Sequence, residues 1–360
     1  MENMGLEIFD NIFYNKRILI TGHTGFKGSW LSIWLNELGS KVLGYALDPY
    51  TENDNFQKAH LSEKIIDVRG DIRDYGKVTA VFKEYQPELV FHLAAQPLVR
   101  EGYLYPKDTY DVNVTGTVNV LECCRRFSFV KGILIITSDK CYENKEWVWG
   151  YRENDPMGGH DPYSSSKGCA ELITSAYQKS FFNKEGSAVL ASARAGNVIG
   201  GGDWAKDRLV PDCIRSLESQ ESIRVRQPLS TRPWQFVLEP LGGYLTLMAQ
   251  MLENPHRFSG GWNFGPYLNS IKPVKEIVNL VIDAWGEGTW QDLSDPNAPH
   301  EANALALDIS KAGTYLNWTP VLDIEEAIHW TVEWYKIYKK ENDMYPFCRQ
   351  QIQDYMERKK

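Results

Sequence analysis

A tyrosine and a lysine four residues apart, Tyr163 and Lys167, form the pair of side chains in this sequence that points most directly to catalysis. At the start of a helix, residues with this spacing share one face. An unperturbed tyrosine has a pKa of about 10, and a neighbouring ammonium group lowers it by favouring the phenolate. Tyr163 could then remove the proton of a substrate hydroxyl while a hydride leaves the same carbon. Lys167 could also bond the ribose of a nicotinamide cofactor.

Three further tyrosine–lysine pairs have the same spacing: Tyr103–Lys107, Tyr335–Lys339 and Tyr355–Lys359. The first contains Pro106, which argues against a helix, and the other two lie in the charged C-terminal segment. Only Tyr163 follows a serine-bearing strand end at a distance that lets it face Ser138 across a cofactor. We interpret the other three pairs as solvated helix or loop residues.

The triplet Ser138–Asp139–Lys140 follows an apolar run, residues 132–137, that predicts a buried strand. Ser138 could position a substrate hydroxyl for Tyr163, or it could only cap the strand end. Asp139 could protonate a leaving hydroxide, which simple alcohol oxidation does not require. Lys140 would need a depressed pKa to act as a base. The alternative for Asp139 and Lys140 is an ion pair in a surface turn.

A glycine-rich turn near the N-terminus predicts the cofactor. The strand-like run 17–21 is followed by Gly22, Gly25 and Gly28, and apolar residues then recur at helical spacing. Such a turn presents backbone N–H groups at a helix N-terminus, where a pyrophosphate is stabilised. Gly22 permits the turn, Gly25 lets the phosphates approach, and Gly28 lets the helix pack on the strand. An ordinary glycine-rich turn is the alternative.

Acidic residues end the next two predicted strands. Asp48 follows residues 41–47 and could bond the adenosine ribose hydroxyls. Asp71, at the end of residues 65–72, could meet the adenine amino group or be a simple turn residue. The residues that we predict to bind NAD are Gly22, Thr24, Gly25, Phe26, Lys27, Gly28, Asp48, Asp71, Ile72, Leu93, Ala94, Ala95, Tyr163 and Lys167.

Strands alternate with helices along most of the chain, which predicts an α/β fold with a Rossmann-like, doubly wound parallel sheet. Further strands are expected at 89–93 and 189–194, and helices at 75–85, 109–127 and 163–182. His92 is expected to be a packed core histidine, and Asn113 either bridges backbone groups near the active site or is a satisfied core amide. We predict an NAD-binding domain of residues 13–196 plus 233–265, an interleaved substrate-binding domain of residues 197–232 plus 266–345, and a tail of residues 346–360.

Other segments are expected to be less regular. Residues 1–15 are predicted to form a short helix or arm, and residues 49–63 an irregular polar stretch. The Trp- and Gly-rich residues 141–162 predict a long functional loop. The charged residues after about Met344 are expected to fray.

Composition excludes several classes of protein. The chain has 360 residues and a net charge of −8, so no overall basic field attracts nucleic acid. The spacing of its six cysteines is typical of neither a disulfide scaffold nor a metal site. We therefore predict reduced thiols and no metal site. Without a signal peptide or a membrane-length apolar run, we expect a cytoplasmic protein.

Taken together, these motifs resemble the extended short-chain dehydrogenase/reductases, and more closely the nucleotide-sugar 4,6-dehydratases that act on CDP-glucose. The resemblance covers about Phe13 to Tyr338. It rests on residues 21–31 (TGHTGFKGSWL), 137–142 (TSDKCY), 163–167 (YSSSK) and 194–204 (RAGNVIGGGDW). The glycine and Tyr/Lys motifs identify only the superfamily, whereas the Ser-Asp-Lys triplet and the glycine-rich Asp-Trp loop are more specific.

The resemblance implies an NAD-dependent conversion of CDP-glucose to its 4-keto-6-deoxy derivative. Tyr163 deprotonates the 4-hydroxyl while hydride passes to NAD⁺, Asp139 protonates the departing 6-hydroxyl, and NADH returns the hydride to C6. Relatives that act on dTDP-glucose carry a glutamate as C5 base where this chain has Lys140, which leaves neutral Lys140 or Tyr163 as the base. The resemblance further implies a homodimer and a step towards deoxysugars of surface polysaccharides such as lipopolysaccharide O-antigen.

Guanidinium groups suit the pyrophosphate of such a substrate. The predicted substrate-binding residues are Gln96, Ser138, Asn197, Arg208, Arg232 and Trp234. Three alternatives remain: a nucleotide-sugar 4-epimerase, a dehydratase of another nucleotide hexose, and a catalytically silent sugar-nucleotide sensor. Asp139 argues against the epimerase, which needs no acid for a leaving hydroxyl.

Overall fold

The computed structural model describes residues 9, 11–294 and 305–359. A seven-stranded parallel sheet forms its centre, in the order β10-β6-β5-β4-β1-β2-β3. The chain lays down β1, β2 and β3 toward one edge and then returns to the other side of β1 for β4. The doubly wound, Rossmann-like fold predicted from the sequence is therefore confirmed. The strands are β1 (Arg17–Thr21), β2 (Lys41–Ala46), β3 (Ile66–Arg69), β4 (Leu89–His92), β5 (Gly132–Ile136), β6 (Val189–Ala195) and β10 (Gly260–Phe264).

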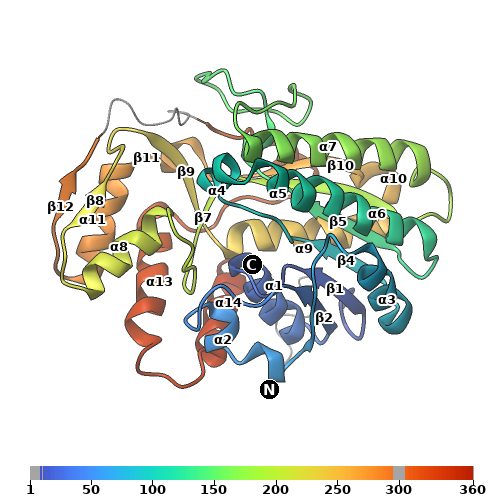
Figure 1. Cartoon of the computed structure of the whole chain (residues 1–360), viewed down its shortest axis with the longest axis horizontal. Helices are drawn as coiled ribbons and strands as arrows, with labels where there is room; N and C mark the ends of the chain where they lie inside the picture. Colours follow the sequence, from blue (N-terminus) through green and yellow to red (C-terminus); the bar gives the residue numbers. More distant parts are fainter. Residues whose placement is uncertain (1–8, 10, 295–304, 360) are drawn as a thin grey trace.

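Helices cover both faces of this sheet (Figure 1). One apolar layer is shared with α1 (Phe26–Glu37), α9 (Leu238–Glu253) and α14 (Tyr345–Arg358). The other is shared with α3 (Tyr75–Tyr85), α6 (Gly116–Arg126) and α7 (Pro162–Phe181). Because both faces are covered, the central strands read as continuous apolar runs rather than alternating ones.

A smaller region follows β6 and carries two short sheets. One has the order β11-β9-β7 and the other pairs β12 with β8. The chain leaves this region to form α9 and β10, and later α12 (Ser310–Leu316), which packs on both of them. The two regions are therefore interleaved in sequence, and the predicted division into two domains stays a prediction. The elements of the smaller region are β7 (Asn197–Ile199), α8 (Leu209–Glu218), β8 (Ile223–Val225), β9 (Thr231–Phe236), β11 (Ile271–Pro273), α11 (Val274–Trp285), β12 (Trp290–Asp292) and α13 (Ile324–Ile337).

One segment expected to be irregular is in fact ordered, and one expected helix starts earlier than predicted. Residues 49–63 contain α2 (Asn55–Lys58) and a 3₁₀ turn at Leu61–Glu63, and Phe56 is buried. The helix expected from residue 109 starts earlier: α5 (Pro106–Tyr110) has proline in its first turn, where that residue is favoured, and runs through a π-helical turn, Asp111–Thr115, into α6. A further helix, α4 (Val99–Leu104), precedes Pro106.

The expectation that the C-terminus frays is wrong. Helix α14 buries Cys348, Ile352 and Tyr355 at helical spacing and lies against α1. The rings of Tyr355 and Trp34 meet edge to face at 5.8 Å, and the Tyr345 hydroxyl accepts a hydrogen bond from Asn36 at 2.7 Å. These apolar and aromatic contacts outweigh the charged composition that suggested a loose end.

Residues 142–161 contain only isolated bridges, at Tyr142–Met157 and from Tyr151 to Leu307, as expected of a long loop. In the part of the chain that the structure describes, no helix is both long and apolar enough to cross a membrane. The expectation of a helix or arm at residues 1–15 falls largely on residues 1–8 and 10, outside the described residues.

Candidate active site

A cavity of about 1130 Å³ lies at the carboxyl ends of the parallel strands. This is the edge at which open α/β sheets bind their ligands. All but one of the predicted site residues line this cavity, the exception being Gln96. Residues far apart in the sequence therefore meet in one place.

The glycine turn between β1 and α1 has the geometry that a dinucleotide needs. Gly22 has a φ of +76°, and a Cβ there would lie 2.7 Å from the backbone nitrogen of Ala94. A Cβ on Gly28 would lie 2.1 Å from the Gly22 carbonyl oxygen, so the helix packs this closely only with glycine. No side chain caps the N-terminus of α1, which opens at Gly25. Its first-turn N–H groups can therefore hold a pyrophosphate.

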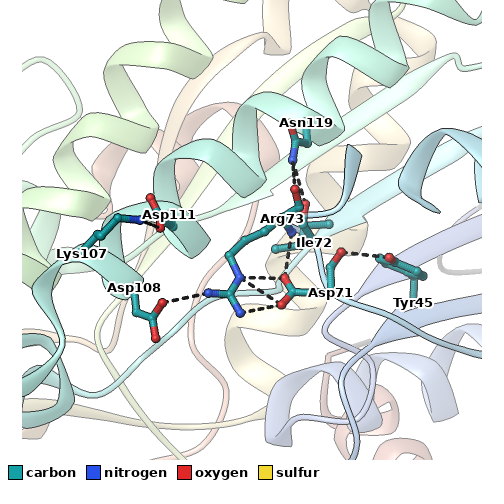
Figure 2. A network of polar contacts seen from close by, with 8 residues as sticks. All are labelled: Tyr45, Asp71, Ile72, Arg73, Lys107, Asp108, Asp111 and Asn119. Atoms are coloured by element: carbon teal, nitrogen blue, oxygen red, sulfur yellow. Dashed lines mark hydrogen bonds and ion pairs between the residues drawn. The ribbon is translucent and has the colours of Figure 1, made fainter. Parts of the chain in front are cut away.

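The β2–β3 end of the cavity, which Asp48 and Asp71 line, is open to solvent. The Asp48 side chain is 90% exposed and its carboxylate lies 3.8 Å from the Arg69 guanidinium. Asp71 accepts hydrogen bonds from Arg73, whose guanidinium also donates to Asp108 (Figure 2). Hydrogen bonds from Arg73 lower the pKa of Asp71. A carboxylate held charged in this position can accept a hydrogen bond from an amino group.

Neighbouring backbone at this end is also held by side chains. The Tyr45 hydroxyl donates to the Asp71 carbonyl at 2.9 Å, and the Asn119 amide donates to the carbonyls of Ile72 and Arg73 (Figure 2). The backbone of residues 71–73 is therefore fixed from β2 and from α6.

His92 and Asn113 organise the strand end next to Leu93–Ala95. His92 is buried between Thr21 and Thr117, with ring nitrogens 2.7 and 3.1 Å from their hydroxyls, and burial lowers its pKa to about 3. It is a packed core histidine, as expected. The Asn113 amide bonds both backbone groups of Gln96 and the Ser166 hydroxyl. Asn113 therefore bridges backbone beside the cavity.

The Gln96 side chain turns away from the cavity that the other predicted residues line. Its amide nitrogen donates to the Leu98 carbonyl and to the Thr109 hydroxyl, and its oxygen accepts from the Leu98 N–H. Both ends of the amide are thus used within the loop that leads to α4. The sequence could not show this, because the bond to Thr109 joins the loop to a residue 13 positions further along the chain.

Ser138, Asp139 and Tyr163 converge at the β5–α7 end of the cavity. Ser138 caps the 3₁₀ turn Asp139–Cys141 and donates to the Asp139 carboxylate at 2.9 Å. The Lys140 ammonium lies 6.0 Å from the centre of the Tyr163 ring. Asp139 is only 3% exposed, so the alternative of an ion pair in a surface turn does not describe this segment.

Lys167 was expected to lower the pKa of Tyr163, but the surroundings of Tyr163 in this structure raise that pKa. Burial raises the pKa of Tyr163 to about 12, and hydrogen bonding with Ser138 and the charge of Arg208 oppose this only in part. Burial lowers the pKa of Lys167 to about 8, against the charge of Glu171. Desolvation at the buried helix start is the largest cause of both shifts, and the pKa of Tyr163 is raised although Lys167 lies four residues away. Within the protein alone, Tyr163 is a neutral phenol.

Burial also raises the pKa of Asp139, although the charges of Lys140 and Arg232 and hydrogen bonds from Ser138 and the Lys140 N–H favour its carboxylate. A carboxyl group that retains its proton more readily than usual suits a general acid. The arrangement therefore places two groups that can exchange a proton with a substrate, Tyr163 and Asp139, in one desolvated pocket.

Lys27, in the first turn of α1, shares this pocket. Burial and the charges of Lys167 and Arg208 lower its pKa to about 7, opposed by Asp139. Lys27 thus links the glycine turn with the predicted catalytic residues at the β5–α7 end of the cavity.

The remaining predicted substrate residues line the cavity from the smaller region. Asn197 begins β7, Arg232 and Trp234 lie on β9, and Arg208 precedes α8. The Arg208 guanidinium bonds the Asp203 carboxylate at 2.7 Å. Arg208 and Arg232 supply the positive charge that a diphosphate needs.

Two residues that the sequence reasoning missed support these predicted ones. Asp203 holds Arg208, and Glu171 lies one turn after Lys167 on α7 in a buried ion pair with Arg194. The four-residue spacing from Lys167 could have pointed to Glu171, because it continues the helical face that begins at Tyr163. Asp203 belongs to the glycine-rich Asp-Trp loop at residues 194–204, but no role was predicted for its carboxylate.

Comparison with known proteins agrees with this geometry. The family model described as GDP-mannose 4,6 dehydratase matches residues 19–331. CDP-glucose 4,6-dehydratase of Salmonella typhimurium is 50% identical over 350 residues, which cover 96% of this chain and 98% of that protein. A probable dTDP-glucose 4,6-dehydratase of Sinorhizobium fredii is 26% identical, covering 89% and 92%.

Solved structures share the fold. An epimerase from Methanothermobacter thermautotrophicus matches with a TM-score of 0.79 and 22% identity, over 97% of this chain and 99% of that one. The dTDP-glucose 4,6-dehydratase of Streptomyces venezuelae, solved with NAD and TYD bound, matches with a TM-score of 0.76 and 20% identity, over 89% and 97%.

Proposed function

The chain belongs to the GDP-mannose 4,6-dehydratase family, and from this membership we propose that it removes water from CDP-glucose to give CDP-4-keto-6-deoxyglucose. The choice of CDP-glucose among nucleotide hexoses follows the Salmonella typhimurium relative, which matches along nearly the whole of both chains. The chain is accordingly a hydro-lyase, and its cofactor is NAD. The glycine turn before α1 would hold the pyrophosphate, and Asp48 and Asp71 the adenosine.

One chemical task belongs to the cofactor: NAD⁺ accepts a hydride from C4 of the sugar and, once reduced, supplies one to C6. The protein's part begins at Tyr163, which takes the proton of the 4-hydroxyl. Lys167 holds positive charge near that site and bonds the ribose, and Ser138 orients the hydroxyl. Since burial raises the pKa of Tyr163 to about 12, the phenolate forms only when further positive charge enters the pocket.

Asp139 distinguishes dehydration from simple redox chemistry. Hydroxide is a poor leaving group unless it is protonated, and the buried Asp139 carboxyl, with its raised pKa, can give that proton to the 6-hydroxyl. Its position beside Ser138, in the cavity that Tyr163 also lines, is the observation that carries the proposal. A 4-epimerase has no use for an acid there.

Two groups can take the C5 proton: Lys140 in its neutral form, or Tyr163 acting a second time. Replacing Lys140 by methionine separates them. If Lys140 is the base, this variant still oxidises C4 but no longer exchanges the C5 hydrogen with solvent deuterium. If Tyr163 is the base, the exchange persists.

Purified protein incubated with CDP-glucose tests the function. We expect loss of one water from the sugar and the alkali-induced absorbance of a 4-keto sugar, both absent in Tyr163→Phe. Formation of CDP-galactose would indicate an epimerase, and unchanged CDP-glucose a sensor. Parallel incubations with the dTDP-, GDP- and UDP-linked sugars identify the preferred nucleotide.

We further propose that the chain acts as a homodimer in the cytoplasm, in a pathway that supplies deoxysugars for surface polysaccharides. Large apolar side chains are exposed on the adjoining helices α4 and α7, including Leu104 and Leu172 at 67% and 61%. A second copy could cover them. Sedimentation of the purified protein tests this: a monomer at micromolar concentration contradicts the dimer.

A further inference from the structure

A buried ion pair lies directly behind the catalytic segment. The carboxylate of Glu171 on α7 and the guanidinium of Arg194 on β6 are 2.8 Å apart, and their side chains are only 4% and 5% exposed. Desolvating two charges costs free energy that their mutual attraction often only balances. A pair in this position is therefore weak evidence for stability, and its hydrogen-bond partners indicate what else it does.

Glu171 is bonded to the residue that precedes the catalytic triplet. Its carboxylate accepts hydrogen bonds from the hydroxyls of Thr137 and Ser192, the latter at 2.7 Å. Burial alone would raise the pKa of Glu171, but Arg194 and these hydroxyls outweigh burial and lower it. Thr137 immediately precedes Ser138, so the charged carboxylate holds the point at which the triplet begins.

Arg194 is hydrogen-bonded to Tyr142, which follows the triplet on its C-terminal side. Its guanidinium donates to the Tyr142 hydroxyl at 2.6 Å and stacks over the Tyr142 ring at 5.1 Å. The Tyr142 hydroxyl in turn donates to the Asn263 amide oxygen at 2.7 Å on β10. Tyr142 lies two residues after Lys140 and is 1% exposed.

The ion pair therefore brackets the triplet, with one member on each flank. We propose that Glu171 and Arg194 are positioning residues, which hold Ser138–Asp139–Lys140 in place opposite Tyr163. Glu171 adds a second constraint, because it lies on the same helix as Tyr163 and Lys167 and so ties the triplet to the helix that carries them. This inference rests on the proposed function, in which Asp139 protonates the departing hydroxyl.

Two hydroxyl deletions around the same carboxylate test it. Thr137→Val and Ser192→Ala each remove one hydrogen bond to Glu171, and both side chains are buried. Only Thr137 adjoins the triplet. We expect kcat for CDP-glucose to fall about tenfold in Thr137→Val at unchanged KM, and less than about twofold in Ser192→Ala, because small misplacement of a reacting group is costly.

A spectroscopic readout separates positioning from a general loss of stability. If Asp139 is misplaced, elimination slows more than oxidation, so reduced nicotinamide absorbance should build up during turnover in Thr137→Val and not in Ser192→Ala. Thermal unfolding of both variants, compared with the parent, measures how much stability each loses when its hydrogen bond to Glu171 is removed. Should Thr137→Val not fold, Tyr142→Phe carries the same test from the Arg194 side, with Tyr151→Phe as control because Tyr151 stacks on Tyr142 without bonding Arg194.

The outcomes separate the two proposals. Equal kcat losses in Thr137→Val and Ser192→Ala, or a loss in Thr137→Val without reduced cofactor, would overturn the positioning role while leaving the function intact. A parent protein that forms no 4-keto sugar from CDP-glucose or another nucleotide hexose would overturn the proposed function itself.

Discussion

The two ends of the cavity place acidic residues at the same edge of one sheet but in opposite surroundings. At the β2–β3 end, Asp71 is paired with an Arg73 side chain that is 39% exposed, and this pairing lowers the Asp71 pKa. At the β5–α7 end, formed by Asp139, Tyr163 and Lys167, Asp139 is 3% exposed and burial raises its pKa. One end thus keeps a carboxylate charged for binding, and the other keeps a proton available for transfer.

This difference teaches that the depth of burial decides which influence sets the pKa of an acidic group along this edge: the paired guanidinium at the exposed end, and desolvation at the buried end. At the exposed end, solvent screens each charge and ion pairs contribute little. At the buried end, desolvation is the largest cause of the shifts: it raises the pKa of Tyr163 despite Ser138 and Arg208, and it lowers the pKa of Lys167 despite Glu171. The predictions below test this contrast, beginning with the largest expected effect.

The same substitution at both ends gives the sharpest comparison. Asp139→Asn retains an acceptor for Ser138 but has no proton to give, so we expect dehydration to fall about 10³-fold. Asp71→Asn removes a charge at the exposed end and should change kcat by less than about threefold. Both are measured as 4-keto product formed from CDP-glucose at saturating NAD⁺. Equal losses would abolish the distinction between the two ends.

The buried end should also affect stability through Lys27. Its pKa is lowered from 10.5 to about 7 by burial and by the charges of Lys167 and Arg208. Between these values the unfolded chain binds a proton that the folded chain has released, so this group makes the free energy of unfolding increase with pH. The destabilisation that comes from burying the charged Lys27 ammonium is complete below about pH 7. It disappears as the pH rises toward 10.5, the pKa of this lysine in the unfolded chain.

We therefore expect Lys27→Met to be more stable than the parent near neutral pH, with an advantage that shrinks at higher pH. Urea unfolding at several pH values between about 7 and 9 measures this. Lys41→Met, at an exposed position at the start of β2, is the control and should show no such trend. A pH-independent difference for Lys27→Met would show that its ammonium is not desolvated.

An intermediate effect is expected from Asp48, which is exposed but proposed to bind the ribose. Asp48→Ala should weaken NAD⁺ binding about tenfold, or about 1.4 kcal/mol, at unchanged stability. Calorimetric titration with NAD⁺ measures the affinity. Glu52→Ala, an exposed carboxylate in the following loop, is the control, and an equal loss in both variants would indicate only long-range attraction.

The smallest effect is expected at the outer ion pair of the β2–β3 end. Asp108 is 64% exposed, and Arg73 keeps its contacts with Asp71 when Asp108 is removed. Asp108→Ala should therefore change the free energy of unfolding by less than about 1 kcal/mol, as urea denaturation would show. A change of several kcal/mol would mean that this end is as desolvated as the other.

Much of the fold was predictable because its signals are local. The runs that form β1 and β5 are apolar and short, and α3 matches the range expected from helical spacing. Segments whose order depends on distant partners were missed: α2 is tied to Gly202 through the Asn55 N–H, and α14 owes its place to α1. The hydrogen bonds of Gln96 were missed for a similar reason, because its partner Thr109 lies 13 residues further along the chain.

By itself, the sequence determined which groups are available and how they are spaced. The glycine turn, the pair Tyr163–Lys167 and the triplet at Ser138 are each encoded within a few residues, where backbone geometry alone sets which side chains share a face. Only the tertiary structure decided which of these groups hold a proton, and which other residues fix them in position. Burial of Tyr163 and Asp139, and the joining of Glu171 to Arg194, arise where segments distant in the chain pack together and exclude water, and no local pattern records how much water they exclude.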